Sequence, residues 1–109
     1  MRALLITPLP MTVQLIEIDD ELEVYQKLVH GYIEIVHAVS LRPYSAAMVV
    51  NEEGVLLDLP CNPLATVLYG DYIAGDAVLV GTSGPDFTDV SLQLLEKIYN
   101  MIGRGEQND

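Results

Sequence analysis

Acidic side chains are the most closely spaced residues of chemical interest in this sequence. Glu17, Asp19, Asp20, Glu21 and Glu23 fall within one short segment. Carboxylates at this spacing can bind a cation, cap the start of a helix or present negative charge to a basic partner. Calcium binding is not favoured, because the ligand spacing of an EF-hand and its glycine are missing. The segment therefore predicts either a helix cap with a solvated face or an acidic surface that binds a protein.

The two histidines and the single cysteine form no recognisable catalytic or metal-binding pattern. The spacing of His30 and His37 fits neither HExxH nor a Cys/His zinc cluster, so we expect ordinary capping or surface roles for them. Cys61 follows a proline in an apolar context and lacks a catalytic signature, which favours a small buried thiol. We therefore assign no catalytic residue and no metal ligand.

A phosphate-binding loop is also not indicated. Ser83 and Gly84 follow an apolar run, as they would in a phosphate-binding turn, but the Walker pattern and its lysine are absent. The spacing of Gly75, Gly81 and Gly84 does not fit GxGxxG. We expect no bound cofactor, and enzyme activity is not favoured.

The charge balance restricts the class of partner. Sixteen Asp and Glu against five Lys and Arg give a net charge of −11. Direct binding to nucleic acid or to an anionic membrane is disfavoured, because both require clustered cations. The negative charge is compatible with a partner that is a basic protein and itself binds DNA or RNA. A further alternative is mimicry of nucleic acid, in which carboxylates stand where phosphates would. Eleven negative charges match about 19 Å of DNA duplex, so such mimicry requires most of the carboxylates on one face of the protein.

Length and composition predict one small domain. The chain has 109 residues, half of them apolar, which is enough for a single core. We assign residues 1–103 to this domain and residues 104–109 to a polar C-terminal tail. No apolar run approaches the roughly 18 to 20 residues that span a bilayer, and a lone cysteine favours the reducing cytoplasm.

The N-terminal part of the sequence predicts a β-hairpin followed by a helix. β-branched and apolar residues at 3–7 and 12–18 predict two strands joined by a proline-containing turn. The second strand has no cleanly polar face, so we expect it to be partly buried on both sides. A helix over residues 20–30 is expected to be capped by Asp19 or Asp20 and ended by Gly31.

The rest of the chain alternates strand and helix signals. The turn at residues 51–54 contains Gly54, placed where a positive φ is easiest, and predicts a second hairpin. Asn62 followed by Pro63 predicts a capped two-turn helix. We expect strands at residues 32–39, 45–51, 55–59 and 76–81, and a loop at residues 82–86. The helix that begins at Pro63 is expected to end at about residue 69, and a last helix is expected to run from a Thr88 or Asp89 cap to about residue 102. The predicted fold is α+β: a single small domain with a mixed or antiparallel sheet built from hairpins, two main helices and one short helix.

Three segments resemble a known family. They are HGYIEIVH from His30 to His37, VVNEEGVLLDLPCNPLA from Val49 to Ala65, and IAGDAVLVG from Ile73 to Gly81. With them the chain resembles, over nearly its full length, the domain of unknown function DUF3846, found largely in phages, plasmids and other bacterial mobile elements. The resemblance implies an origin and a fold, and it implies no reaction.

The leading functional hypothesis is a non-enzymatic phage or mobile-element accessory protein in the cytoplasm of the bacterial host. It would bind a host protein through an acidic surface, as an anti-defence protein of the anti-CRISPR, nuclease-inhibitor or DNA-mimic kind. One alternative is a small-ligand or nucleotide-binding domain whose pocket is lined by the loops around Asn51, Asn62 and residues 81–86. Another is a structural module that forms homo-oligomers. The expected partner-binding residues are Glu17, Asp19, Asp20, Glu21, Glu23, Glu52 and Glu53.

Overall fold

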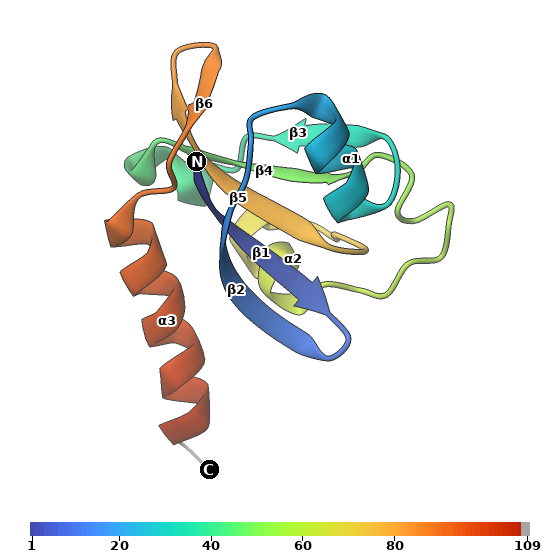
Figure 1. Cartoon of the computed structure of the whole chain (residues 1–109). Coiled ribbons are helices and arrows are strands. Elements are labelled where there is room, and N and C mark those ends of the chain that lie inside the picture. Colours follow the sequence, from blue (N-terminus) through green and yellow to red (C-terminus); the bar gives the residue numbers. More distant parts are fainter. Residues whose placement is uncertain (108–109) are drawn as a thin grey trace.

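The computed structural model describes residues 1–107, with side chains as far as Gly103, and it has the predicted α+β architecture of one small domain. All strand pairs in the sheet are antiparallel; the order is β2-β1-β5-β4-β3, and β6 pairs with β5 (Figure 1). The elements are β1 (Arg2–Pro8), β2 (Met11–Glu17), α1 (Leu22–Val29), β3 (Ile33–Val36), the 3₁₀ helix η1 (Val39–Tyr44), β4 (Ala46–Asn51), α2 (Pro63–Tyr69), β5 (Ala77–Ser83), β6 (Asp86–Thr88) and α3 (Leu92–Gln107).

Helices cover both faces of the sheet, so the core has two parts. Tyr25 and Val29 of α1 pack on one face. On the other face, η1, α2 and α3 pack on alternate residues of the same strands, because successive side chains of a strand point to opposite faces. Because helices lie on both faces, the central strands β4 and β5 are buried on both faces. α1 and α3 lie on opposite sides of the sheet (Figure 1). Within residues 1–107, no helix is long and apolar enough to cross a membrane.

The first hairpin is confirmed, and its second strand is partly buried on both faces, as expected. β1 and β2 pair from Arg2 opposite Glu17 to Pro8 opposite Met11. Most β2 side chains are exposed, and only Val13 and Ile16 are half-buried. Val13 packs against the core cluster on one face of the sheet and Ile16 against the cluster on the other face, although β2 is an edge strand.

Helix α1 exists, but its capping differs from the prediction. Glu21 is the N-cap residue and makes no side-chain capping hydrogen bond, and the Asp20 carboxylate instead accepts one from the Tyr25 hydroxyl at 2.7 Å. His30, with φ 64°, takes the left-handed conformation expected for Gly31. Gly31 is needed for another reason: a Cβ there would lie 2.8 Å from the Asn51 side-chain nitrogen.

The second predicted hairpin is wrong, because both edges of β4 are already occupied. β4 pairs with β3 on one side and β5 on the other, so residues 55–59 have no free edge to join. They belong instead to a chain of tight turns, here called the 52–59 loop. The Leu57 amide donates to the Glu53 carbonyl at 2.9 Å, and the Leu59 amide donates to the Gly54 carbonyl at 3.0 Å. Gly54 allows a close backbone approach rather than a positive φ, since a Cβ there would lie 2.5 Å from the Ala74 carbonyl oxygen.

The C-terminal half combines confirmed and missed elements. Helix α2 is confirmed: the Asn62 side chain accepts from the Ala65 amide, Pro63 occupies the first turn, and Gly70 ends the helix with φ 88°. Strand 32–39 is shorter than expected, and η1 follows it. Residues 82–86 form the tip of a β5–β6 hairpin rather than an unpaired loop.

The last helix starts later than predicted. The Ser91 hydroxyl, and not Thr88 or Asp89, accepts the hydrogen bond from the Leu94 amide at 3.2 Å. The Asp89 carboxylate accepts instead from the Arg2 amide. The expected tail at residues 104–109 is helical as far as Gln107, and residues 108–109 lie outside the described part of the chain.

Candidate functional site

The acids predicted to bind a partner divide between two places. Glu17 lies at the end of β2 with its side chain 81% exposed, and its carboxylate is 3.2 Å from the amino group of Met1. Asp19 is exposed in the connection between β2 and α1. The remaining predicted acids line a set of hollows around α1 and β3, which are described in turn below.

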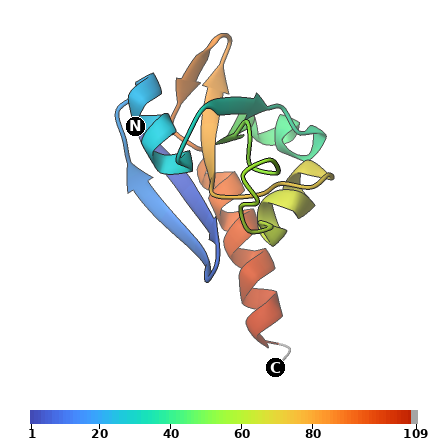
Figure 2. The same cartoon turned by 90° about the vertical axis from the view of Figure 1, so that its right-hand side faces the viewer.

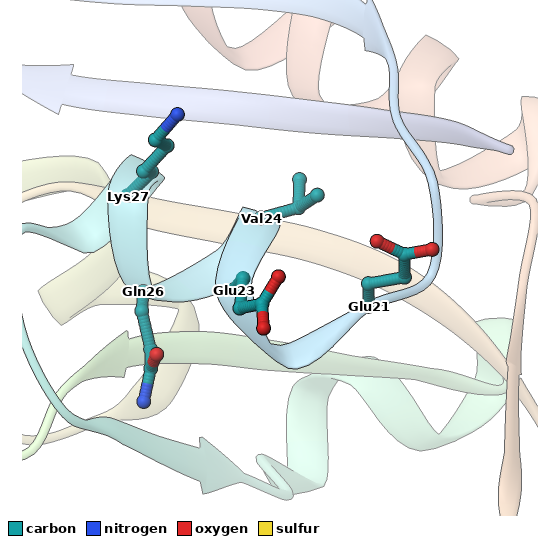
Figure 3. Close-up of a pocket in the computed structure, with 5 residues that line it drawn as sticks. All are labelled: Glu21, Glu23, Val24, Gln26 and Lys27. Atoms are coloured by element: carbon teal, nitrogen blue, oxygen red, sulfur yellow. The ribbon is translucent and has the colours of Figure 1, made fainter.

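The first hollow lies on the outer face of α1. Glu21, Glu23, Val24, Gln26 and Lys27 line it (Figure 3). Lys27 points away from the two carboxylates in this view and forms no ion pair among the described residues. The face is therefore negative at its N-terminal end.

The second hollow lies beside the 52–59 loop and is here called the loop pocket. It has a volume of about 130 Å³ and is lined by three carboxylates, Glu34, Glu52 and Glu53, together with apolar side chains that include Leu56 and Tyr72. Val55 and Leu56 are 68% and 83% exposed. The turns hold this apolar tip in place, because the Gly75 amide donates to the Pro60 carbonyl at 2.7 Å and fixes the far end of the loop.

A third hollow has one lining residue in common with each of the first two. It is lined by Gln26, His30, Gly31, Tyr32, Glu53 and Leu57. Gln26 also lines the outer face of α1, and Glu53 also lines the loop pocket. The helix and the loop therefore line neighbouring hollows.

The fourth hollow lies against the β5–β6 hairpin and is here called the hairpin pocket. It has a volume of about 420 Å³ and is lined by Asp20, Ile35, His37, Thr82, Gly84, Pro85, Asp86 and Phe87. The hairpin projects beyond the rest of the sheet at the top of Figure 1.

Tyr25 lies beneath the hairpin pocket and fixes two of its walls. Its ring packs edge-on against Phe87 at 5.7 Å between centroids, and its hydroxyl holds Asp20. Burial raises the pKa of Tyr25, and the hydrogen bond and charge of Asp20 raise it further. The Tyr25 hydroxyl is therefore protonated at neutral pH and acts as a hydrogen-bond donor.

Together these hollows form what we call the acidic surface, which surrounds β3 and the exposed side of α1. Lys27 is the one cation among the residues that line them. Arg42 and Lys97 belong to η1 and α3, which cover the opposite face of the sheet. The carboxylates of the acidic surface are Asp20, Glu21, Glu23, Glu34, Glu52, Glu53 and Asp86.

The structure brings together most of the predicted acids and adds two more. Asp20, Glu21, Glu23, Glu52 and Glu53 lie on the acidic surface, and Glu17 and Asp19 line none of its hollows. Glu34 and Asp86 were missed by sequence reasoning. An isolated acid in a predicted strand could have revealed Glu34, whereas Asp86 is one of several acids in predicted turns, whose mutual distances the sequence does not give.

The other residues weighed from the sequence have structural or surface positions. Cys61 is exposed, which corrects its expected burial: it lies at the entry to α2, where the chain is on the surface. His30 is exposed, with Nε2 3.3 Å from an Asp76 carboxylate oxygen. Among the described residues, no three His, Cys, Asp or Glu side chains are placed to hold a metal ion.

Asn51 and Asn62 are buried and committed to structural hydrogen bonds. The Asn51 amide donates to the Val29 carbonyl at 3.0 Å, and its oxygen accepts from the Glu53 amide at 2.7 Å. The Asn62 amide donates to the carbonyls of Ile6 and Gly75. Neither side chain is available to a ligand without losing these bonds.

Comparison with known proteins gave one match. A family model described as "Domain of unknown function (DUF3846)" matches residues 1–103. No curated protein matches the chain, and no solved structure does.

Proposed function

Since the chain belongs to the DUF3846 family, whose description names no activity, we propose its function from its surface: it is a non-enzymatic protein that binds a basic host protein. The binding site is the acidic surface. Its centre is the exposed tip of the 52–59 loop, and its rim is the surrounding carboxylates.

The observation that carries this proposal is the combination of apolar and acidic residues at one rigid loop. Val55, Leu56 and Leu57 are exposed side by side, next to Glu52 and Glu53. Protein interfaces commonly have an apolar centre that supplies binding energy and a polar rim that supplies specificity. A surface that only solubilised the protein would not need the apolar tip.

Charge segregation supports a basic partner. The carboxylates of the acidic surface oppose a single lysine, in a chain whose net charge is −11. Such a surface attracts a cationic protein over a Debye length of about 8 Å at physiological ionic strength. A host defence protein that binds nucleic acid has the required charge, and a phage or plasmid protein that blocked it would act as an anti-defence factor. The apolar tip makes this binding differ from pure mimicry of DNA, because DNA offers no equivalent of Leu56.

The proposal can be tested by measuring binding to purified nucleic-acid-binding proteins of a bacterial host in 50 mM and 500 mM NaCl. The test variant is Glu52→Gln, Glu53→Gln, Leu56→Ser, and the control is Glu17→Gln, Asp19→Asn, which neutralises the same number of acids outside the acidic surface. We expect binding that weakens at least tenfold in the test variant and at high salt, and that changes less than twofold in the control. Equal binding by both variants would contradict the proposal.

The hairpin pocket favours a second candidate, a small-ligand-binding domain. Its volume of about 420 Å³ is typical of small-molecule sites. Asp20 and Asp86 favour a cationic ligand over a nucleotide, because phosphates would be repelled. Thermal unfolding with spermidine and with ATP tests it: a ligand at 100 times its dissociation constant adds about 2.7 kcal/mol of stability. An unchanged unfolding temperature with both would exclude these two ligand classes.

A further inference from the structure

We propose that the partner contributes an extended basic segment, which pairs as an additional strand with the free edge of β3. This inference rests on the proposed function, because it specifies how the acidic surface recognises its partner. The occupant is a polypeptide with Lys or Arg at alternating positions.

The outer edge of β3 is open to pairing. Among the described residues, β3 pairs with β4 and with no other strand. In Figure 2, β3 crosses the near side of the molecule in teal, with the 52–59 loop beside it. Unpaired backbone groups at such an edge are a template for another strand.

The register identifies which backbone groups point outward. The Glu52 amide donates to the Tyr32 carbonyl at 2.8 Å, so Tyr32 and Glu52 form a hydrogen-bonded pair. Hydrogen-bonded and non-hydrogen-bonded pairs alternate along an antiparallel ladder. Glu34 therefore bonds to β4, and Ile33 and Ile35 present their amides and carbonyls to the open edge.

The two sides of this edge are both acidic. Glu34 lines the loop pocket with Glu52 and Glu53, whereas the next residue, Ile35, lines the hairpin pocket with Asp20 and Asp86. Side chains of an added strand would alternate between these two pockets, because successive residues of a strand point to opposite faces. A segment with alternating cations would therefore point its Lys or Arg side chains into one acidic pocket and its apolar side chains against the apolar lining of the other.

Charge also decides against a second copy of this chain as the occupant. An antiparallel pairing of β3 with its symmetry mate would bring the Glu34 side chains and their neighbouring acids together. Like charges directly across a strand pair are destabilising, and each copy carries a net charge of −11. A basic segment meets no such repulsion.

The experiment measures binding of a synthetic seven-residue peptide of alternating Lys and Val by NMR amide shifts and by amide hydrogen exchange. The test variant is Ile35→Pro, which removes one outward amide, since proline is tolerated on an edge strand whose amide faces solvent. The matched control is Leu15→Pro on β2. The Ile18 amide donates to the Met1 carbonyl, so Ile18 bonds to β1. Since residues of β2 alternate between bonding to β1 and facing outward, the Leu15 amide faces outward, at the opposite open edge of the sheet. The two side chains are similarly exposed, at 43% for Ile35 and 46% for Leu15.

We expect the peptide to slow exchange at the amides of Ile33 and Ile35, and its affinity to fall at least tenfold in Ile35→Pro and less than twofold in Leu15→Pro. A peptide with alternate backbone N-methyl groups should bind wild-type protein at least tenfold more weakly, which tests the pairing without relying on the folding of a proline variant. A Glu-Val peptide should not bind.

Contrary outcomes separate this inference from the proposed function. If Ile35→Pro and the N-methylated peptide bind normally while Glu52→Gln, Glu53→Gln weakens binding, the acidic surface is correct and strand pairing is wrong. If all variants bind the peptide equally or not at all, both proposals fail. A dimer in light scattering that Ile35→Pro abolishes would assign the edge to a second copy and overturn the inference.

Discussion

The two edges of the sheet differ in length, charge and support. The β2 edge is seven residues long and is flanked by neutral side chains such as Gln14, with Glu17 at its end beside the Met1 amino group. The β3 edge is four residues long and lies between two pockets lined by carboxylates. The longer edge has the larger row of free backbone groups, yet the shorter one has the features of a binding site. The loops around an edge, more than the strand itself, therefore set which chemical groups border it.

The edges also differ in how the fold supports them. At the β3 edge, the buried Asn51 side chain joins the end of α1 to the start of the 52–59 loop. At the β2 edge, the side-chain contact near the turn is between the hydroxyls of Thr7 and Thr12 and is exposed to water. The first is a structural anchor, and the second can be replaced by hydrogen bonds to solvent.

The largest effect is expected for Asn51→Ala. This change leaves the buried Val29 carbonyl and the partly buried Glu53 amide without their partner, which should lower the free energy of unfolding by about 2–4 kcal/mol. Urea unfolding measures it, with Thr12→Ala as the exposed control, for which we expect less than about 0.5 kcal/mol. Similar losses for both variants would remove the distinction between the two edges.

A smaller effect is expected for Tyr25→Phe, which removes the hydrogen bond to Asp20 beside the hairpin pocket. We expect about 1 kcal/mol of lost stability at neutral pH, from one hydrogen bond. Because the pKa of Tyr25 is raised on folding from its ordinary value of 10.0, its contribution is fully present below pH 10 and is lost as the pH rises above it. The difference in the free energy of unfolding between wild type and Tyr25→Phe should therefore shrink in alkaline urea titrations. If the difference in the free energy of unfolding stayed constant with pH, it would contradict the role of the protonated Tyr25 hydroxyl as a hydrogen-bond donor.

Leu56→Ser should separate recognition from folding. The side chain is almost fully exposed, so the free energy of unfolding should change by less than about 0.5 kcal/mol. Binding of a basic partner protein should nevertheless weaken at least fivefold, because the apolar centre of the surface is lost. Calorimetric titration and thermal unfolding measure the two effects in the same sample. A loss of stability without a loss of binding would make Leu56 a structural residue.

The smallest effect is expected for Glu17→Gln at the β2 edge. Its ion pair with the Met1 amino group is exposed, and exposed ion pairs contribute little because water and salt screen them. The unfolding temperature should fall by about 2 °C or less, and partner binding should not change. A large effect on binding would extend the acidic surface to the β2 edge and weaken the comparison.

Sequence reasoning succeeded where a few neighbouring residues set the backbone. The proline turn between β1 and β2 and the Asn62–Pro63 start of α2 were predicted from their local conformational demands. It failed where a local signal competed with long-range pairing. The turn after Asn51 looked like a hairpin, but β5 and β3 already occupy both edges of β4.

The sequence by itself determined the fold class, the family, the negative charge and the start of one helix, because these depend on composition and on contacts between close neighbours. Only the tertiary structure decided that Asp20, Glu34 and Asp86 lie around one sheet edge, and that Glu17 lies at the other. The physical reason is that strand order places residues far apart in the chain side by side. That order follows from the burial of the whole sheet, and no short segment encodes it.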